Sequence, residues 1–290
     1  MRNYDVGARA AHFQEVARIR VGDLRSGKRY IDGTTAVGRA ELLSARERIL
    51  ATAQNAHGRP VVTGISASIL HGTKWFDPHF DVELLHDLAG STWKGAGRTV
   101  RRYQLAPSDV TDIDGVLVTS RVRTAFDVGR IPPAWRGLGN LDALHRAAPF
   151  SFLALIKYID EHRGWRYIRQ LRAIAPLVDG AAESPPESWL RLLLIQSGLP
   201  LPELQIVVVD ETGYGFARVD MGYRGPKIAI EYDGEEFHSS EEQQDCDARR
   251  DAKLAALGWA TVHVDAERLF DRPWTILTEV EQLLHERGAY

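Results

Sequence analysis

Three carboxylates, Asp220, Glu231 and Asp233, lie in a short segment that reads RVDMGYRGPKIAIEYDGEEFH (218–238). Like charges that oppose each other destabilise a pair of strands. Such a group is tolerated in a partly buried site when a divalent cation lies between the carboxylates, and hard oxygen ligands suit Mg²⁺ or Mn²⁺. The three residues are therefore candidate ligands of Mg²⁺ or Mn²⁺.

The position of these carboxylates depends on the register of a predicted hairpin. We take 224–227 as a four-residue connecting loop, so that Tyr223 opposes Ile228. Counting back along both strands places Asp220 opposite Glu231. Alternation of side chains along the second strand puts the third carboxylate on the same face. The alternatives are a register shifted by one residue, or an exposed hairpin end whose carboxylates are solvated.

Two features favour a defined site over solvated carboxylates. The strand that reads KIAIEYDG is otherwise apolar, so its acidic residues are confined to one end. His238 follows Asp233 on a polar loop that can fold back over the same place. We therefore expect the carboxylates and a histidine to meet at this end of the strand.

The pattern RVD…KIAIEYDG…FH…D..R...L...GW resembles the endonuclease-like domains that are related to the very-short-patch mismatch-repair endonucleases, within the PD-(D/E)XK superfamily. The resemblance covers about 183–288. Further residues at the family's spacing are Asp247, Arg250, Leu254, Gly258 and Trp259. The resemblance implies a Mg²⁺-dependent phosphodiesterase fold that acts on DNA, with Asp220 and Glu231 as metal ligands.

The chain departs from the superfamily pattern at one position. The pattern has a lysine two residues after the glutamate, where this chain has Asp233. In the very-short-patch relatives a nearby histidine takes part in the chemistry, and His238 matches it in position. The resemblance therefore implies that His238 is the acid/base group and that Asp233 is a ligand or an orienting carboxylate.

Glu187 has two interpretations. In nucleases of this kind a glutamate of the first helix often reaches the metal, which makes Glu187 a further catalytic candidate. The letters SPPE also form a capping box, with Ser184 at the N-cap and Glu187 at the third helical position. Capping explains Glu187 without catalysis, and the sequence leaves both interpretations open.

The N-terminal half carries the pieces VVTGISASILHG and VTSRVRTAFD. They resemble the core domain of AbiEi-type antitoxins, which implies an association with DNA and a cognate toxin as a partner. Such proteins usually begin with a winged helix-turn-helix, but residues 1–60 read as wing-like strands and a helix, without a recognition helix. Arginines 98, 101, 102, 121 and 123 form two basic clusters, which we interpret as solvated edge strands. His71 is expected to be a packed histidine.

The order of elements predicts an α/β (α+β) chain. The letters LVDGAAESPPE gather glycine, serine and proline, as a linker does. After this linker, 181–290 reads as helix, three strands, helix, strand and helix (αβββαβα), which implies a nuclease-like mixed sheet with flanking helices. Before it, 61–180 reads as a smaller antitoxin-like α+β domain.

Composition sets outer limits on function. The 290 residues are 44% hydrophobic and 26% charged, with a net charge of −3 and a single cysteine, Cys246. No apolar run approaches a membrane span and nothing resembles a signal peptide, so we expect a cytoplasmic protein with no membrane partner. The leading hypothesis is a metal-dependent DNA endonuclease. The alternatives are a non-catalytic DNA-binding regulator or antitoxin with a degenerate nuclease fold, and a toxin-binding protein with no role on DNA.

Overall fold

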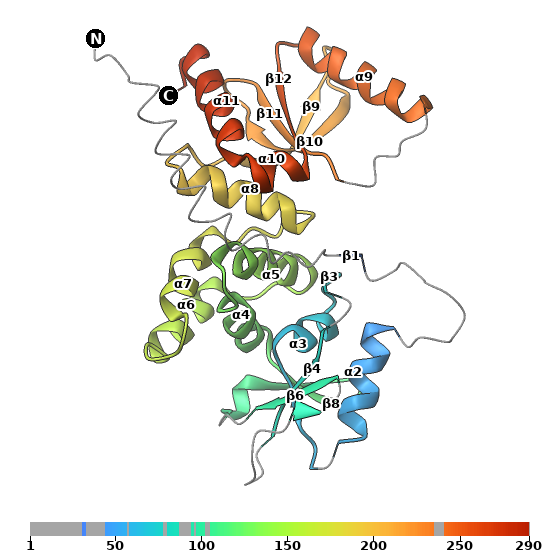
Figure 1. The fold of residues 1–290 in the computed structure, drawn as a ribbon, viewed down its shortest axis with the longest axis vertical. Helices are drawn as coiled ribbons and strands as arrows, with labels where there is room; N and C mark the ends of the chain where they lie inside the picture. Colours follow the sequence, from blue (N-terminus) through green and yellow to red (C-terminus); the bar gives the residue numbers. More distant parts are fainter. Residues whose placement is uncertain are drawn as a thin grey trace. The chain divides into compact units, whose positions relative to one another are not determined.

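The computed structural model describes residues 31–32, 44–56, 58–77, 80–86, 94–95, 97–101, 105–234 and 241–289 (Figure 1). Contacts between Cα atoms divide the chain after Gly180 into two compact units. In the described ranges, no helix combines the length and the apolar character that crossing a membrane requires.

The N-terminal unit contains a mixed β-sheet. In their hydrogen-bonded order, its described strands are β5 (Lys94–Gly95), β6 (Arg98–Arg101), β4 (Val82–Leu85), β2 (Val61–Val62), β8 (Val116–Thr119) and β7 (Val110–Ile113). Strand β2 runs antiparallel to β4 and parallel to β8. A separate antiparallel pair joins β1 (Ile31–Asp32) to β3 (Trp75–Phe76). This unit is therefore a mixture of helices and strands, as the sequence predicted.

The helices of this unit are α2 (Ala45–Gln54), α3 (Gly64–Leu70), α4 (Arg121–Gly129), α5 (Ala134–Ala147), α6 (Phe152–Glu161) and α7 (Ile168–Ile174), with 3-10 turns η1 (Pro107–Asp109) and η2 (Ala175–Leu177). Helix α2 starts at a capping box formed by Ser44 and Glu47. Ile49 of α2 packs in the same core as Val62 and Leu84 of the sheet. Helix α2 therefore shares one core with the sheet of this unit.

Two expectations about charged residues of this unit need correction. Strand β6, which carries Arg98, lies between β5 and β4 and is not an edge strand. Arg123 is only 1% exposed, and its guanidinium donates to Asp127 and to the hydroxyl of Tyr158. His71 is packed as expected, with Nε2 2.8 Å from the carbonyl oxygen of Thr119. Arg102 and the predicted wing before residue 31 lie outside the described residues.

The C-terminal unit follows the predicted order with one addition. Its elements are α8 (Pro185–Gln196), β9 (Glu203–Val209), β10 (Gly215–Tyr223), β11 (Ile228–Tyr232), α9 (Glu241–Ala256), β12 (Ala260–Val264), α10 (Ala266–Asp271) and α11 (Pro273–Glu286). The short helix α10 was not predicted. Asp265 caps it by accepting from the backbone N–H of Arg268, and Pro273 at the first position of α11 starts a new helix.

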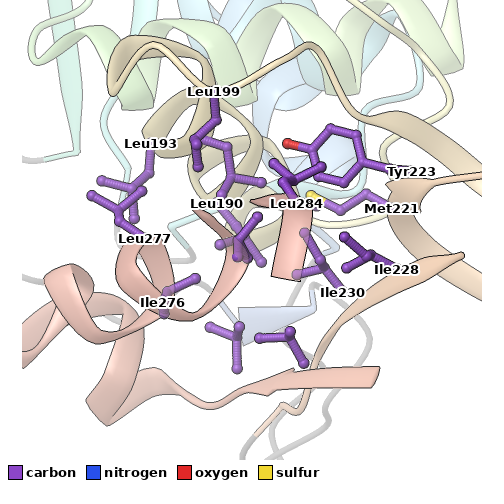
Figure 2. Close-up of a cluster of buried hydrophobic side chains, with 14 of the residues drawn as sticks. Leu190, Leu193, Leu199, Met221, Tyr223, Ile228, Ile230, Ile276, Leu277 and Leu284 are labelled. Atoms are coloured by element: carbon purple, nitrogen blue, oxygen red, sulfur yellow. The ribbon is translucent and has the colours of Figure 1, made fainter. Parts of the chain in front are cut away.

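The sheet of this unit has the order β12-β11-β10-β9, antiparallel except for the parallel pair β11–β12. Side chains of α8 and α11 cover one face, where Leu190 and Leu277 pack with Ile230 (Figure 2). Leu254 of α9 packs with Ala229, whose side chain points to the opposite face. The sheet is therefore mixed and buried between helices, as predicted.

The hairpin register that we counted from the sequence is confirmed. Tyr223 pairs with Ile228, and Met221 pairs with Ile230. A Cβ atom at Gly222 would collide with the carbonyl oxygen of Ile228, so the close approach of the two strands requires glycine there. Extending this register by one residue places Asp220 opposite Glu231.

Candidate acidic site of the C-terminal unit

Glu187 lies in the first turn of α8 and is only 6% exposed. Its Oε1 accepts a hydrogen bond from the hydroxyl of Ser184 (2.8 Å), and its Oε2 accepts from the backbone N–H of Glu183 (2.8 Å) and from Gln205 Nε2 (3.2 Å). Burial raises the pKa of Glu187 to about 7, and the carboxylate of Asp220 raises it further. Glu187 therefore both stabilises the helix start and faces the predicted site.

Asp220 lies where β10 and β11 separate. Its Oδ2 accepts a hydrogen bond of 2.9 Å from the backbone N–H of Tyr232. The carboxylate thus takes the place of a backbone carbonyl at the end of β11. Burial raises the pKa of Asp220, and the carboxylate of Glu183 adds to the rise, whereas the Tyr232 hydrogen bond and the charges of Arg218 and Arg250 lower it.

Glu231 is 6% exposed and lies one strand away from Asp220. Its Oε2 forms an ion pair with Arg250 of α9. Its Oε1 is buried, and no described residue forms a hydrogen bond with it. Burial raises the pKa of Glu231 to about 7 despite the opposing charge of Arg250, and Asp220 contributes to the rise. A buried carboxylate oxygen without a partner is costly, which is a reason to look for a ligand at this place.

Asp233 takes part in a different arrangement from the one predicted. Its Oδ2 is 3.1 Å from Nδ1 of His263 on β12, and Nε2 of the same ring is 3.2 Å from Oδ2 of Asp251 on α9. The hydrogen bond to Asp233 is the main reason that the pKa of His263 is raised, to about 9. Both ring nitrogens therefore carry protons at neutral pH, and His263 is a cation held between two carboxylates.

The structure brings together part of the predicted site. Electrostatic coupling links Glu187 to Asp220 and Asp220 to Glu231. Within the described residues, however, no three aspartate, glutamate, histidine or cysteine side chains form a group that could hold a metal. The convergence of Asp220, Glu231 and Asp233 that we expected is therefore not present, because Asp233 pairs with His263. His238 lies outside the described residues, and its assigned role stays a prediction.

Sequence reasoning missed His263, Asp251 and Gln205 as neighbours of the site. His263 is the parallel-strand partner of Glu231. No short turn connects β11 to β12, so no loop length fixes this register in the sequence. The alternation in WATVHVDA was the available signal, since it predicts a strand, but it does not say which neighbouring residue the histidine meets.

Comparisons with known proteins gave relatives without an assigned activity. Two proteins of Mycobacterium tuberculosis, Uncharacterized protein Rv2248 of strain H37Rv and Uncharacterized protein MT2308 of strain CDC 1551, are each 34% identical over 182 residues, which is 63% of this chain and 67% of each relative. No family model matches the chain, and no solved structure matches it significantly. The resemblances to endonucleases and to AbiEi-type antitoxins therefore stay predictions.

Proposed function

We propose that this chain, which belongs to the same protein family as the mycobacterial proteins Rv2248 and MT2308, is a metal-dependent endonuclease that hydrolyses phosphodiester bonds of DNA. One observation carries the proposal. The buried carboxylate of Glu231 has an oxygen without a partner, beside the carboxylate of Asp220. Two acidic groups are kept in a place that raises the pKa of each, which is more typical of a functional site than of a structural one.

Two carboxylates offer the hard oxygen donors that suit a divalent cation. Asp220 and Glu231 would hold it, and the carboxylate of Asp220 lies close enough to Glu187 to raise the pKa of Glu187. Mg²⁺ or Mn²⁺ bound there would polarise a phosphate group and lower the pKa of a water molecule. The ion pair with Arg250 uses one oxygen of Glu231 and leaves the other for a ligand.

The residues of the chain would divide the remaining work. Arg250 fixes the orientation of the Glu231 carboxylate, and Tyr232 fixes that of Asp220 through its backbone N–H. Asp233 orients the cationic ring of His263, and we assign it no role as a metal ligand. Proton transfer is assigned to His238, on the resemblance alone.

A cleavage survey tests this proposal. Wild type would be incubated with supercoiled plasmid, linear duplex and single-stranded DNA, each with Mg²⁺, Mn²⁺ or EDTA. We expect cleavage of at least one DNA form with a divalent cation and none with EDTA. Asp220→Asn should lose activity, whereas Glu267→Gln, whose side chain is 64% exposed on α10, should not. Cleavage by Asp220→Asn at the wild-type rate would refute the assigned site.

A second candidate is a non-catalytic DNA-binding regulator or antitoxin with a degenerate nuclease fold. Two ion pairs favour it: Arg250 already pairs with Glu231, and His263 already pairs with Asp233, so both carboxylates have a cationic partner without a metal. The antitoxin resemblance would then make a cognate toxin the partner. This reading predicts DNA binding without cleavage under every metal condition of the survey, with no effect of Asp220→Asn on binding.

A further inference from the structure

We infer that the outer half of the β9–β10 hairpin binds the DNA substrate through its uncovered face. This inference rests on the proposed function of the acidic site beside it. Its surface, which we call the ribbon face, consists of Val207, Val209, Tyr214 and Arg218.

The pairing of the strands leaves this part of the hairpin as a two-stranded ribbon. Strand β10 pairs with β9 from Gly215 to Gly222, but with β11 only from Met221 to Tyr223. Since β11 ends at Tyr232, the ribbon continues past the end of β11, at the edge of the site where Asp220 lies. A two-stranded β-ribbon has the right width to enter the major groove of DNA.

One side of the ribbon is covered and the other is not. Ile206, Val208 and Val219 are buried in the cluster that contains Leu254 of α9. On the alternating positions, Val207 is 48% exposed and Val209 is 54% exposed. Tyr214, at the end of the hairpin, is 70% exposed. Adjacent apolar side chains on one uncovered face, unlike scattered single ones, indicate a surface that binds something.

The place of the ribbon face points to DNA as the occupant. Arg218, the strand partner of Val207, reaches Glu183 at the start of α8, 2.7 Å away, and its charge acts on Asp220. The ribbon face is therefore continuous with the acidic site. Its chemistry suits nucleic acid, because an exposed tyrosine can stack on a base, valines can contact thymine methyl groups, and an arginine that is 55% exposed can bind a phosphate.

The hairpin is built to hold this face in a fixed shape. Asp210 Oδ1 accepts hydrogen bonds from the backbone N–H groups of Thr212 and Tyr214 and from the hydroxyl of Thr212 (2.6 Å). On the covered side, Lys253 of α9 pairs with Asp210 and lies over the ring of Phe216, 4.1 Å from its centroid. The turn that presents Tyr214 is thus tied to the body of the unit.

The test measures DNA binding separately from cleavage. A fluorescein-labelled duplex would be titrated with full-length protein in Ca²⁺ or EDTA, for wild type, Tyr214→Ser and Val209→Ser. The matched control is Leu201→Ser. Leu201 is also an exposed apolar side chain of this unit, 66% exposed, but it lies outside the ribbon face. We expect Kd to rise by about tenfold for Tyr214→Ser, as for loss of one base stack, and to stay unchanged for Leu201→Ser.

Salt dependence and oligomeric state complete the test. Arg218→Gln should reduce the slope of log Kd against log salt by about one, which is the change expected for the loss of one phosphate contact. Wild-type affinity in both ribbon variants would overturn the inference, and a change from dimer to monomer in them would assign the face to a second copy of this chain. If wild type binds and cleaves DNA while the ribbon variants bind equally well, the inference fails and the proposed function stands. If wild type does not bind DNA at all, both fail.

Discussion

Replacing Glu187 by glutamine should make the protein more stable at alkaline pH, although it removes a buried side chain that accepts three hydrogen bonds. The carboxylate is 6% exposed and lies near Asp220, so its ionised form is unfavourable in the folded state. Glutamine has nearly the same shape and no charge. Its amide oxygen can accept from Glu183, and its amide group can donate to the hydroxyl of Ser184.

The magnitude follows from the pKa of Glu187. Folding raises it from 4.5 to about 7, so the folded state binds this proton more tightly than the unfolded chain. The stability that this provides is fully present below pH 4.5 and is lost as the pH rises to about 7. A difference of this size corresponds to roughly 3 kcal/mol. Since one lost hydrogen bond costs about 1 kcal/mol, Glu187→Gln should be about 1 kcal/mol less stable at pH 4.5 and about 2 kcal/mol more stable at pH 8.

Urea denaturation of wild type and Glu187→Gln at a series of pH values between 4.5 and 8, followed by tryptophan fluorescence, measures this difference. The measured quantity is the difference in the free energy of unfolding between the two proteins. Its sign should reverse with pH, so that wild type is the more stable protein at pH 4.5 and the variant at pH 8. Glu267→Gln is the control for an exposed glutamate and should show no such reversal. A constant destabilisation of Glu187→Gln at every pH would show that Glu187 is an ordinary capping residue.

Three further predictions concern metal, charge and the N-terminal unit. Millimolar Mg²⁺ or Mn²⁺ should raise the melting temperature of wild type, because a ligand that binds the folded state stabilises it. Asp220→Ala should lose this response and, without metal, should melt at or above the temperature of wild type. Identical metal responses of the two proteins would contradict the metal site. His263 has a pKa raised to about 9, so its contribution to stability is fully present below pH 6.5 and disappears as the pH rises through 9. His263→Gln should therefore have a lower urea midpoint than wild type at pH 6.5 and an equal one at pH 10, and a constant deficit would refute this. Arg123→Met should destabilise the protein by roughly 1–3 kcal/mol in thermal denaturation, because it removes a buried guanidinium that donates to Asp127 and to Tyr158 while Asp127 keeps its ion pair with Arg130, whereas Met at the exposed neighbour Arg121 should cost little.

The hairpin shows which part of the site the sequence could predict. A short loop fixes the register of the strands that it joins, so the Tyr223–Ile228 pair and the position of Asp220 could be counted along the chain. The order of helices and strands in this unit followed from apolar periodicity, and the mixed sheet followed from that order.

The partners of the carboxylates could not be predicted in the same way. Arg250 and Asp251 come from a helix whose packing angle on the sheet is set by tertiary contacts, and His263 comes from a parallel strand without a turn to fix its register. The same is true of Arg123, which a pattern of basic residues indicates as solvated and which packing buries against Asp127. Sequence spacing determines local neighbours, whereas these pairs depend on how separate elements pack.

The proposed function requires that Asp220 and Glu231 hold a divalent cation that is needed to cleave DNA. The most direct test is the initial rate of DNA cleavage as a function of Mn²⁺ concentration for wild type, Asp220→Asn, Glu231→Gln and the control Glu267→Gln. We expect saturable, metal-dependent cleavage by wild type and by the control, and a loss of at least about a hundredfold in both site variants. Metal-dependent cleavage that survives in Asp220→Asn and Glu231→Gln, or no cleavage by wild type at any Mn²⁺ concentration, would contradict it.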